Sequence, residues 1–171
     1  MQKAFFISMI ITAASKTFAQ IPATGTWFAL QLPVKISDKW QWHNDAGYRT
    51  LGASFNAYQF LYRTGIRHVV NKIWSVATGA AVFYTRSSYQ KYNHEFGGEF
   101  RLWQELNAQH PVSKSISFQN RIRTEQRWFA VTDSRDAYFG FRIRYRAAAT
   151  KELSEKWSIQ LANEYMRQQA N

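Results

Sequence analysis

Cysteine is absent from the chain of 171 residues, and proline occurs only three times. Without cysteine the protein has no disulfide framework, no thiolate metal site, no thiol nucleophile and no attachment point for a lipoprotein anchor. Long apolar runs are also missing, because none reaches the roughly 20 residues that a membrane-spanning helix needs. The sequence therefore argues against a helical membrane protein and against a small disulfide-linked domain.

Aromatic and basic residues are abundant instead. Aromatics make up 17% of the chain, with 7 Trp, 9 Tyr and 13 Phe, and disordered chains lack such residues. Lys and Arg number 22 against 11 acidic residues, which gives a formal net charge of +11. The length is that of one domain. Many aromatics, many arginines and few prolines suggest strands that contact both an apolar and a polar phase.

The first residues have the pattern of a signal peptide. Lys3 provides a short basic start, residues 4–14 form an apolar segment, and Thr17-Phe18-Ala19 places small residues at both cleavage-recognition positions. We expect residues 1–19 to be removed, which leaves residues 20–171 as one exported domain. A buried first helix is the alternative interpretation.

Polar and apolar side chains alternate with period two through nearly all of the remaining chain, which indicates β-strands. Most of the expected strands are longer than the five or six residues of an ordinary strand. They match the ~9–11 residues with which a tilted strand crosses a bilayer. The eight predicted strands are 27–36, 40–50, 58–69, 73–85, 95–109, 116–129, 138–149 and 157–167.

Short polar turns alternate with longer connections between these strands. Trp40, Trp74 and Trp157 stand at or near strand starts, each close to a lysine of the preceding turn. Such tryptophans suit the level of the lipid headgroups. Short turns at one end and longer loops at the other are typical of an outer-membrane barrel. The predicted fold is therefore all-β, an antiparallel up-and-down transmembrane β-barrel.

One face of the predicted strands is charged and contains no lysine. In the strand 116–129, Arg123 and Glu125 fall on this face and Ile122 on the other. Arginine binds carboxylates through two parallel hydrogen bonds and stays charged when partly buried. We therefore expect an inner charge network. Its predicted members are Glu99, Arg101, Glu105, Arg121, Arg123, Glu125, Arg127, Arg142, Arg144, Arg146 and Glu164, with Asp45, Arg49, Arg63, Arg67 and Glu95 on the same face.

Three stretches of the sequence resemble a known family. Residues 99–106 read EFRLWQEL, residues 120–128 read NRIRTEQRW, and residues 141–146 read FRIRYR. With Asn163-Glu164, they resemble the strands of the outer-membrane β-barrel proteins grouped as domain of unknown function 2490, found in Bacteroidetes-type bacteria. The resemblance spans roughly residues 26–167. It implies a barrel in the outer membrane of a Gram-negative bacterium, and it implies no activity and no catalytic residues.

The same resemblance bears on the end of the chain. Barrels of this family continue beyond the Asn-Glu strand with at least two more strands and end on an aromatic-rich one. This sequence ends in Gln168-Gln169-Ala170-Asn171. Either the chain is C-terminally truncated or the barrel closes with eight strands.

Three function classes follow from these patterns. The first is a structural or porin-like outer-membrane barrel, whose charged interior forms a plug in a narrow barrel or an anion-preferring pore in a wider one. The second is an outer-membrane lipid hydrolase, because Ser87, Ser88, His94 and Glu95 include the residue types of a Ser–His–acid site. The third is a soluble periplasmic β-sandwich or barrel that binds an acidic ligand, since period two does not distinguish inside from outside.

The expected partners are outer-membrane lipid and the barrel-assembly machinery. The export signal argues against nucleic acid as a partner. The four histidines have no metal-ligand spacing, so we expect no metal and no cofactor. The oligomeric state is left open.

Overall fold

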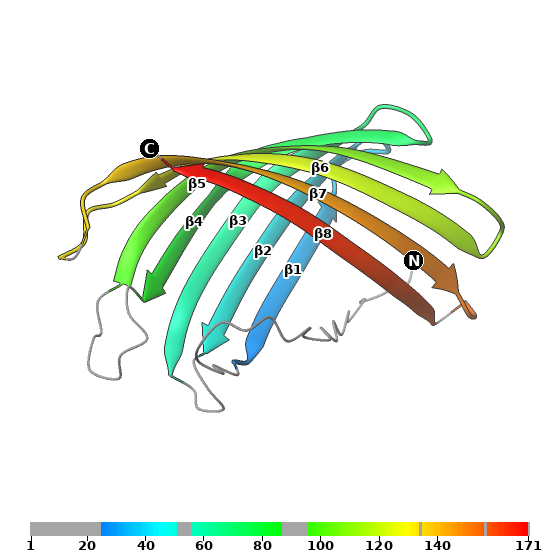
Figure 1. Ribbon diagram of the computed structural model, residues 1–171. Coiled ribbons are helices and arrows are strands. Elements are labelled where there is room, and N and C mark those ends of the chain that lie inside the picture. Colours follow the sequence, from blue (N-terminus) through cyan, green and yellow to red (C-terminus); the bar gives the residue numbers. More distant parts are fainter. Residues whose placement is uncertain (1–24, 51–55, 87–95, 134, 156, 171) are drawn as a thin grey trace.

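The computed structural model describes residues 25–50, 56–86, 96–133, 135–155 and 157–170. Eight antiparallel strands form one sheet in sequence order, each hydrogen-bonded to the next (Figure 1). No helix in the described part of the chain is long and apolar enough to cross a membrane. The strands are β1 (Trp27–Lys35), β2 (Trp40–Thr50), β3 (Ala57–Val69), β4 (Trp74–Arg86), β5 (Phe96–Pro111), β6 (Ile116–Phe129), β7 (Tyr138–Glu152) and β8 (Ser158–Ala170).

The predicted all-β, up-and-down arrangement is confirmed, and every strand boundary lies within three residues of its predicted position. The sheet curves into an arch and is open (Figure 1). β1 and β8 are its edges, and no Cα atom of β1 lies within 8 Å of a Cα atom of β8. Closure into a barrel is thus not present among the described strands. Residues 1–19, predicted as a signal peptide, lie outside the described residues.

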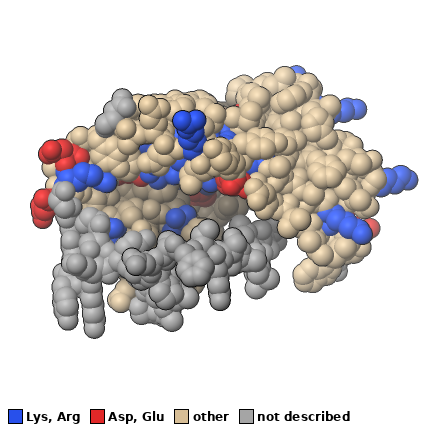
Figure 2. All heavy atoms as spheres, viewed as in Figure 1, with Lys and Arg blue, Asp and Glu red and all other residues tan. Residues whose placement is uncertain are grey.

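The two faces of the arch differ in chemistry. The convex face exposes large apolar side chains, among them Trp42, Phe100 and Ile143, each more than a third exposed. Figure 2 shows this outer surface as mostly uncharged. The concave face carries the charged side chains that alternate with these apolar ones along each strand. Most of the buried charged side chains belong to β5 and β6. The curvature brings these long polar side chains together beneath the sheet.

Four short turns share one hydrogen-bonding pattern at one end of the arch. In each, two successive backbone N–H groups donate to one carbonyl, that of Trp40, Trp74, Ile116 or Trp157. In three turns a side-chain oxygen accepts from the backbone N–H groups that follow it, as Asn71 Oδ1 does from the amides of Ile73 (2.9 Å) and Trp74 (2.8 Å). These bonds close the turn locally. The tryptophans predicted for the headgroup level thus occupy equivalent positions at one rim.

The first turn also holds an exposed ion pair. Lys35 Nζ donates to Asp38 Oδ1 at 2.7 Å. This hydrogen bond, with the charge of Lys35, lowers the pKa of the Asp38 carboxyl from its ordinary value. Both side chains are highly exposed, so the pair contributes little to stability.

Trp103 of β5 forms the centre of a small apolar cluster on the concave face, with Ala77, Ala81 and Phe83 of β4. Its ring needs space that only glycine leaves. A Cβ atom built on Gly79 would stand 2.1 Å from the Thr64 carbonyl oxygen and 2.6 Å from Trp103 Cζ2. The small residues of β3 and β4 therefore let the indole lie flat against the sheet.

We predict that Gly79→Ala destabilises the protein by about 1–3 kcal/mol, because the new methyl group meets a rigid backbone oxygen. Gly98→Ala is the matched control, since its Cβ would lie 3.7 Å from the nearest atom. Chemical unfolding in detergent, followed by Trp fluorescence, measures both variants. Equal midpoints would show that the packing around Trp103 tolerates a larger side chain.

Candidate functional site

Apart from Lys35 and Glu152 at strand ends, the described concave face carries twice as many bases as acids. All of these bases are arginines, so each is a planar cation with several hydrogen-bond donors. The acids are Asp45, Glu99, Glu105, Glu125 and Glu164, and the bases are Arg49, Arg63, Arg67, Arg101, Arg121, Arg123, Arg127, Arg142, Arg144 and Arg146. Glu95, predicted for this face, lies outside the described residues.

Arginines stand directly opposite one another at three cross-strand positions of this face. Like charges at opposite positions destabilise a sheet. A carboxylate that contacts both strands offsets this repulsion. The three pairs are Arg101–Arg127, Arg123–Arg144 and Arg121–Arg146.

Glu99 binds both arginines of the first pair. Arg101 Nη2 donates to Glu99 Oε2 at 2.8 Å, and Arg127 Nη2 donates to the same oxygen at 3.1 Å. Both Nε–H groups donate to the other oxygen, Oε1. One carboxylate on β5 thereby holds two guanidinium groups, one on its own strand and one on β6.

Glu125 of β6 links three arginines. Arg142 Nε donates to its Oε2 at 2.8 Å, Arg101 Nη1 to the same oxygen at 3.4 Å, and Arg144 Nη1 to Oε1 at 3.3 Å. Glu125 is only 3% exposed. Its charge is therefore compensated entirely from β5 and β7, the strands on either side.

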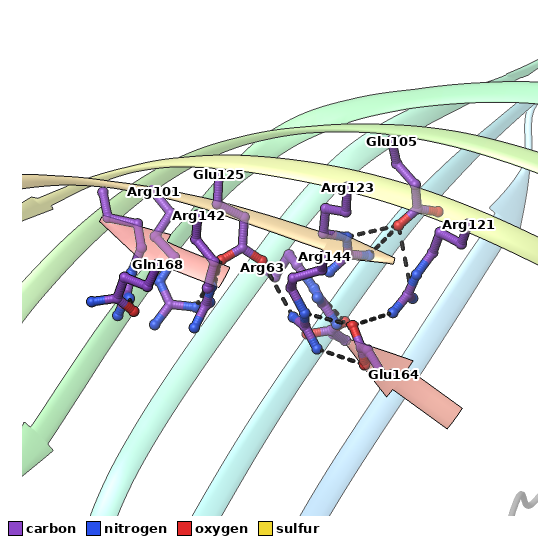
Figure 3. Close-up of polar contacts among 12 residues, drawn as sticks. Arg63, Arg101, Glu105, Arg121, Arg123, Glu125, Arg142, Arg144, Glu164 and Gln168 are labelled. Carbon is purple, nitrogen blue, oxygen red and sulfur yellow. Dashed lines mark hydrogen bonds and ion pairs between the residues drawn. The ribbon is translucent and has the colours of Figure 1, made fainter. Parts of the chain in front are cut away.

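Glu105 and Glu164 complete the set. Arg123 Nε donates to Glu105 Oε2 at 2.7 Å. Arg144 Nε and Nη2 bind the two oxygens of Glu164 at 2.6 and 3.0 Å, and Arg121 Nη2 donates to Glu164 Oε1 at 3.2 Å. Figure 3 shows these side chains converging beneath the sheet from β5, β6, β7 and β8.

The shared arginines join these carboxylates into one arginine–carboxylate network. Arg121 bridges Glu105 to Glu164, Arg144 bridges Glu164 to Glu125, and Arg101 bridges Glu125 to Glu99. The network consists of Glu99, Glu105, Glu125, Glu164, Arg67, Arg101, Arg121, Arg123, Arg127, Arg142 and Arg144. Arg63 and Asp45 form a separate pair.

Aromatic rings shield part of this network. The guanidinium of Arg101 lies 3.6 Å from the ring centroid of Phe83, and that of Arg123 lies 5.0 Å from the ring centroid of Trp103. Such cation–π contacts strengthen when water is excluded. The apolar cluster of β4 and β5 thus packs against the guanidinium groups of two network arginines.

Most but not all of the residues predicted for the network take part in it. Arg146 has no ion pair with a described acid and donates instead to Gln160 Oε1 at 2.8 Å. Two uncharged participants were not predicted: Asn107 Nδ2 donates to Glu105 Oε1 at 2.7 Å, and Gln168 accepts from Arg127. Both share the period-two phase of the charged residues, which was the signal available in the sequence.

The residues considered for a hydrolase site, Ser87, Ser88, His94 and Glu95, lie outside the described residues. Within the described ranges, no group of three or more His, Asp or Glu side chains is arranged to hold a metal ion. The chemistry seen on the described concave face is the pairing of arginines with carboxylates.

Comparison with known proteins identifies one family. The family described as "Protein of unknown function (DUF2490)" matches residues 24–171, which covers most of the chain. No curated protein and no solved structure matches the chain.

We predict that Arg123→Gln or Glu105→Gln destabilises the protein by about 3–5 kcal/mol, because each leaves a buried charge without its main partner. The side chains of Arg123 and Glu105 are only 8% and 3% exposed. Arg146→Gln removes the same charge from the same face outside the network, and should cost less than about 1 kcal/mol. Denaturant unfolding in detergent compares the three, and similar losses in all of them would show that the network adds no particular stability.

Proposed function

The chain belongs to the DUF2490 family of proteins of unknown function, and we propose that its sheet forms the wall of an outer-membrane β-barrel. In this proposal the convex face meets lipid and the concave face, with its arginine–carboxylate network, lines the lumen. The charged interior is primarily structural: it fills the lumen and holds neighbouring strands together.

The convex surface supports contact with lipid. Away from the strand ends, the described residues of β1 to β7 present no charged side chain on this face, and Arg167 near the end of β8 is the exception. Exposed apolar patches of this extent mark interaction surfaces or membrane contact. All eight strands lie in one sheet. No second described sheet covers the aromatic face, as a soluble sandwich would require.

Uncharged polar groups on the convex face bind one another. Thr64 Oγ1 donates to Asn44 Oδ1 at 2.9 Å and accepts from Trp42 Nε1 at 2.8 Å. Thr124 Oγ1 donates to Gln104 Oε1 at 2.9 Å. Polar groups in an apolar medium need such partners, because lipid offers none. This pairing suits a surface that faces hydrocarbon.

The edges of the sheet impose a further requirement. In a bilayer the free backbone groups of β1 and β8 must find hydrogen-bond partners, because an unpaired edge is too costly there. Insertion therefore requires that these edges pair, with each other or with additional strands.

One observation carries the structural role: four carboxylates and seven arginines form a continuous network whose most buried members are under 10% exposed. The excess of arginine favours a second candidate, a pore that prefers anions. Purified protein in planar bilayers distinguishes them. A structural interior should give no steady conductance, whereas reproducible anion-selective steps would establish the pore.

The membrane assignment predicts a face-dependent cost for an introduced charge. Ile122 lies on the convex face of β6 and is 45% exposed. Ile122→Arg should cost about 2–4 kcal/mol near the middle of the bilayer. Gln119→Arg, on the concave face of the same strand, should cost much less. Reversible unfolding in phospholipid vesicles measures both, and equal costs would contradict the lipid-facing assignment.

A further inference from the structure

A cavity of about 350 Å³ opens on the concave face and is lined by residues of β1 to β6. It lies toward the end of the arch that carries the short turns, because Arg67 stands two residues from the end of β3. The charged residues that line it are Asp45, Arg63, Arg67, Glu105, Arg121 and Arg123. Four cations thus face two carboxylates.

Each of the two carboxylates already binds one arginine, Asp45 through its Oδ2 and Glu105 through its Oε2. Arg63 Nε donates to Asp45 Oδ2 at 2.8 Å. Glu105 Oε2 accepts from Arg123 at 2.7 Å, and Glu105 Oε1 accepts from Asn107 at 2.7 Å. One arginine on each acid therefore balances the acids of this cavity.

Arg67 and Arg121 are the remaining cations. Arg67 Nη2 lies 3.7 Å from Glu105 Oε1, and Arg121 Nη1 lies 3.8 Å from Glu105 Oε2. These distances are too long for hydrogen bonds. The two guanidinium groups are therefore held beside the same carboxylate, one near each of its oxygens, without being bonded to it.

Both groups keep unused donors. Arg67 makes no hydrogen bond with any described residue, and Arg121 uses only Nη2, in its bond to Glu164. The buried Nε atoms of both side chains have no hydrogen-bond partner among the described residues, and the same holds for the indole Nε1 of Trp103, which also lines the cavity. The Arg67 side chain is 31% exposed and that of Arg121 17%, so both can be reached from the cavity.

We propose that this cavity binds a phosphate-class oxyanion between Arg67 and Arg121. Planar guanidinium forks match the oxygens of a phosphate group, and two of them can bind several oxygens at once. The phosphate reaches the site either as a soluble phosphate ester or as the headgroup of a phospholipid at the rim. The site rests on the proposed barrel, since the concave face must be the wet interior for a soluble anion to enter.

The test uses the full chain in a maltoside detergent with phosphate-free buffer, and calorimetric titration with three probes. Inorganic phosphate represents the soluble source, dihexanoyl phosphatidic acid below its micellar concentration represents the lipid source, and acetate at equal ionic strength is the control anion. We expect saturable binding of phosphate at one site and no matching signal with acetate. Displacement of one phosphate probe by the other identifies a shared site, and saturation by only one of them identifies the source.

Two variants locate the site. Arg67→Gln and Arg121→Gln should each weaken phosphate binding by about tenfold or more, because each removes a charged hydrogen-bond donor. Arg49→Gln is the matched control: Arg49 lies on the same face of β2, stacks on Trp27 at 3.8 Å, and does not line the cavity. The Arg67 side chain is 31% exposed and lies 3.7 Å from Glu105 without a hydrogen bond, so Arg67→Gln should shift the unfolding midpoint less than Arg121→Gln and remains interpretable if that variant does not fold.

Three results would overturn the site: no saturable binding of either phosphate probe, equal binding of acetate, or an equal loss in Arg49→Gln. The outcome is separable from that of the barrel. Loss of the face-dependent cost at Ile122 and Gln119 with retained phosphate binding contradicts the barrel alone. A barrel that inserts normally but binds no phosphate contradicts the site alone.

Discussion

Repulsion between arginines is the constraint on which the concave face depends. Three cross-strand positions oppose one arginine to another, and a carboxylate that binds at least one arginine of each pair offsets the repulsion. Glu99 binds both members of the Arg101–Arg127 pair, and Glu125 reaches arginines on β5 and β7 at once. Each acid thereby acts as a cross-link between neighbouring strands. Arginine suits this arrangement because one guanidinium can serve two carboxylates, which the single ammonium of lysine does less well.

The same alternation that gathers charge on one side leaves the other side apolar. Exposure of both faces of this sheet to water is unfavourable, because the convex side presents a continuous aromatic and aliphatic surface. In the proposed barrel this side faces lipid, and the mutual hydrogen bonds of Asn44, Thr64, Gln104 and Thr124 fit an environment without water. The rim of short turns, with Trp40, Trp74 and Trp157, then marks one boundary of the apolar band.

Structural pairing and ligand binding compete for the same side chains. Where carboxylates are shared among arginines, as around Glu125, the donors are used within the protein. Around Glu105 both oxygens are taken by Arg123 and Asn107, and Arg67 and Arg121 are left beside a filled acceptor. An excess of cations over acceptors is what distinguishes a binding surface from a purely structural network. This local imbalance is the observation on which the proposed oxyanion site rests.

The strands, their antiparallel order and the face on which each side chain lies could be predicted from the sequence, because period two and turn residues are local properties. Even the repeated turn, with Ser37, Asn71 or Ser113 accepting from following amides, is encoded locally. Which arginine binds which acid could not be predicted from local patterns, since a pairing depends on register and on the curvature that brings β5 to β8 together. The tertiary structure separated Arg146, bound to Gln160, from the network, and it showed that Gly79 makes room for Trp103. Local periodicity specifies a face, whereas partners across several strands depend on the shape of the whole sheet.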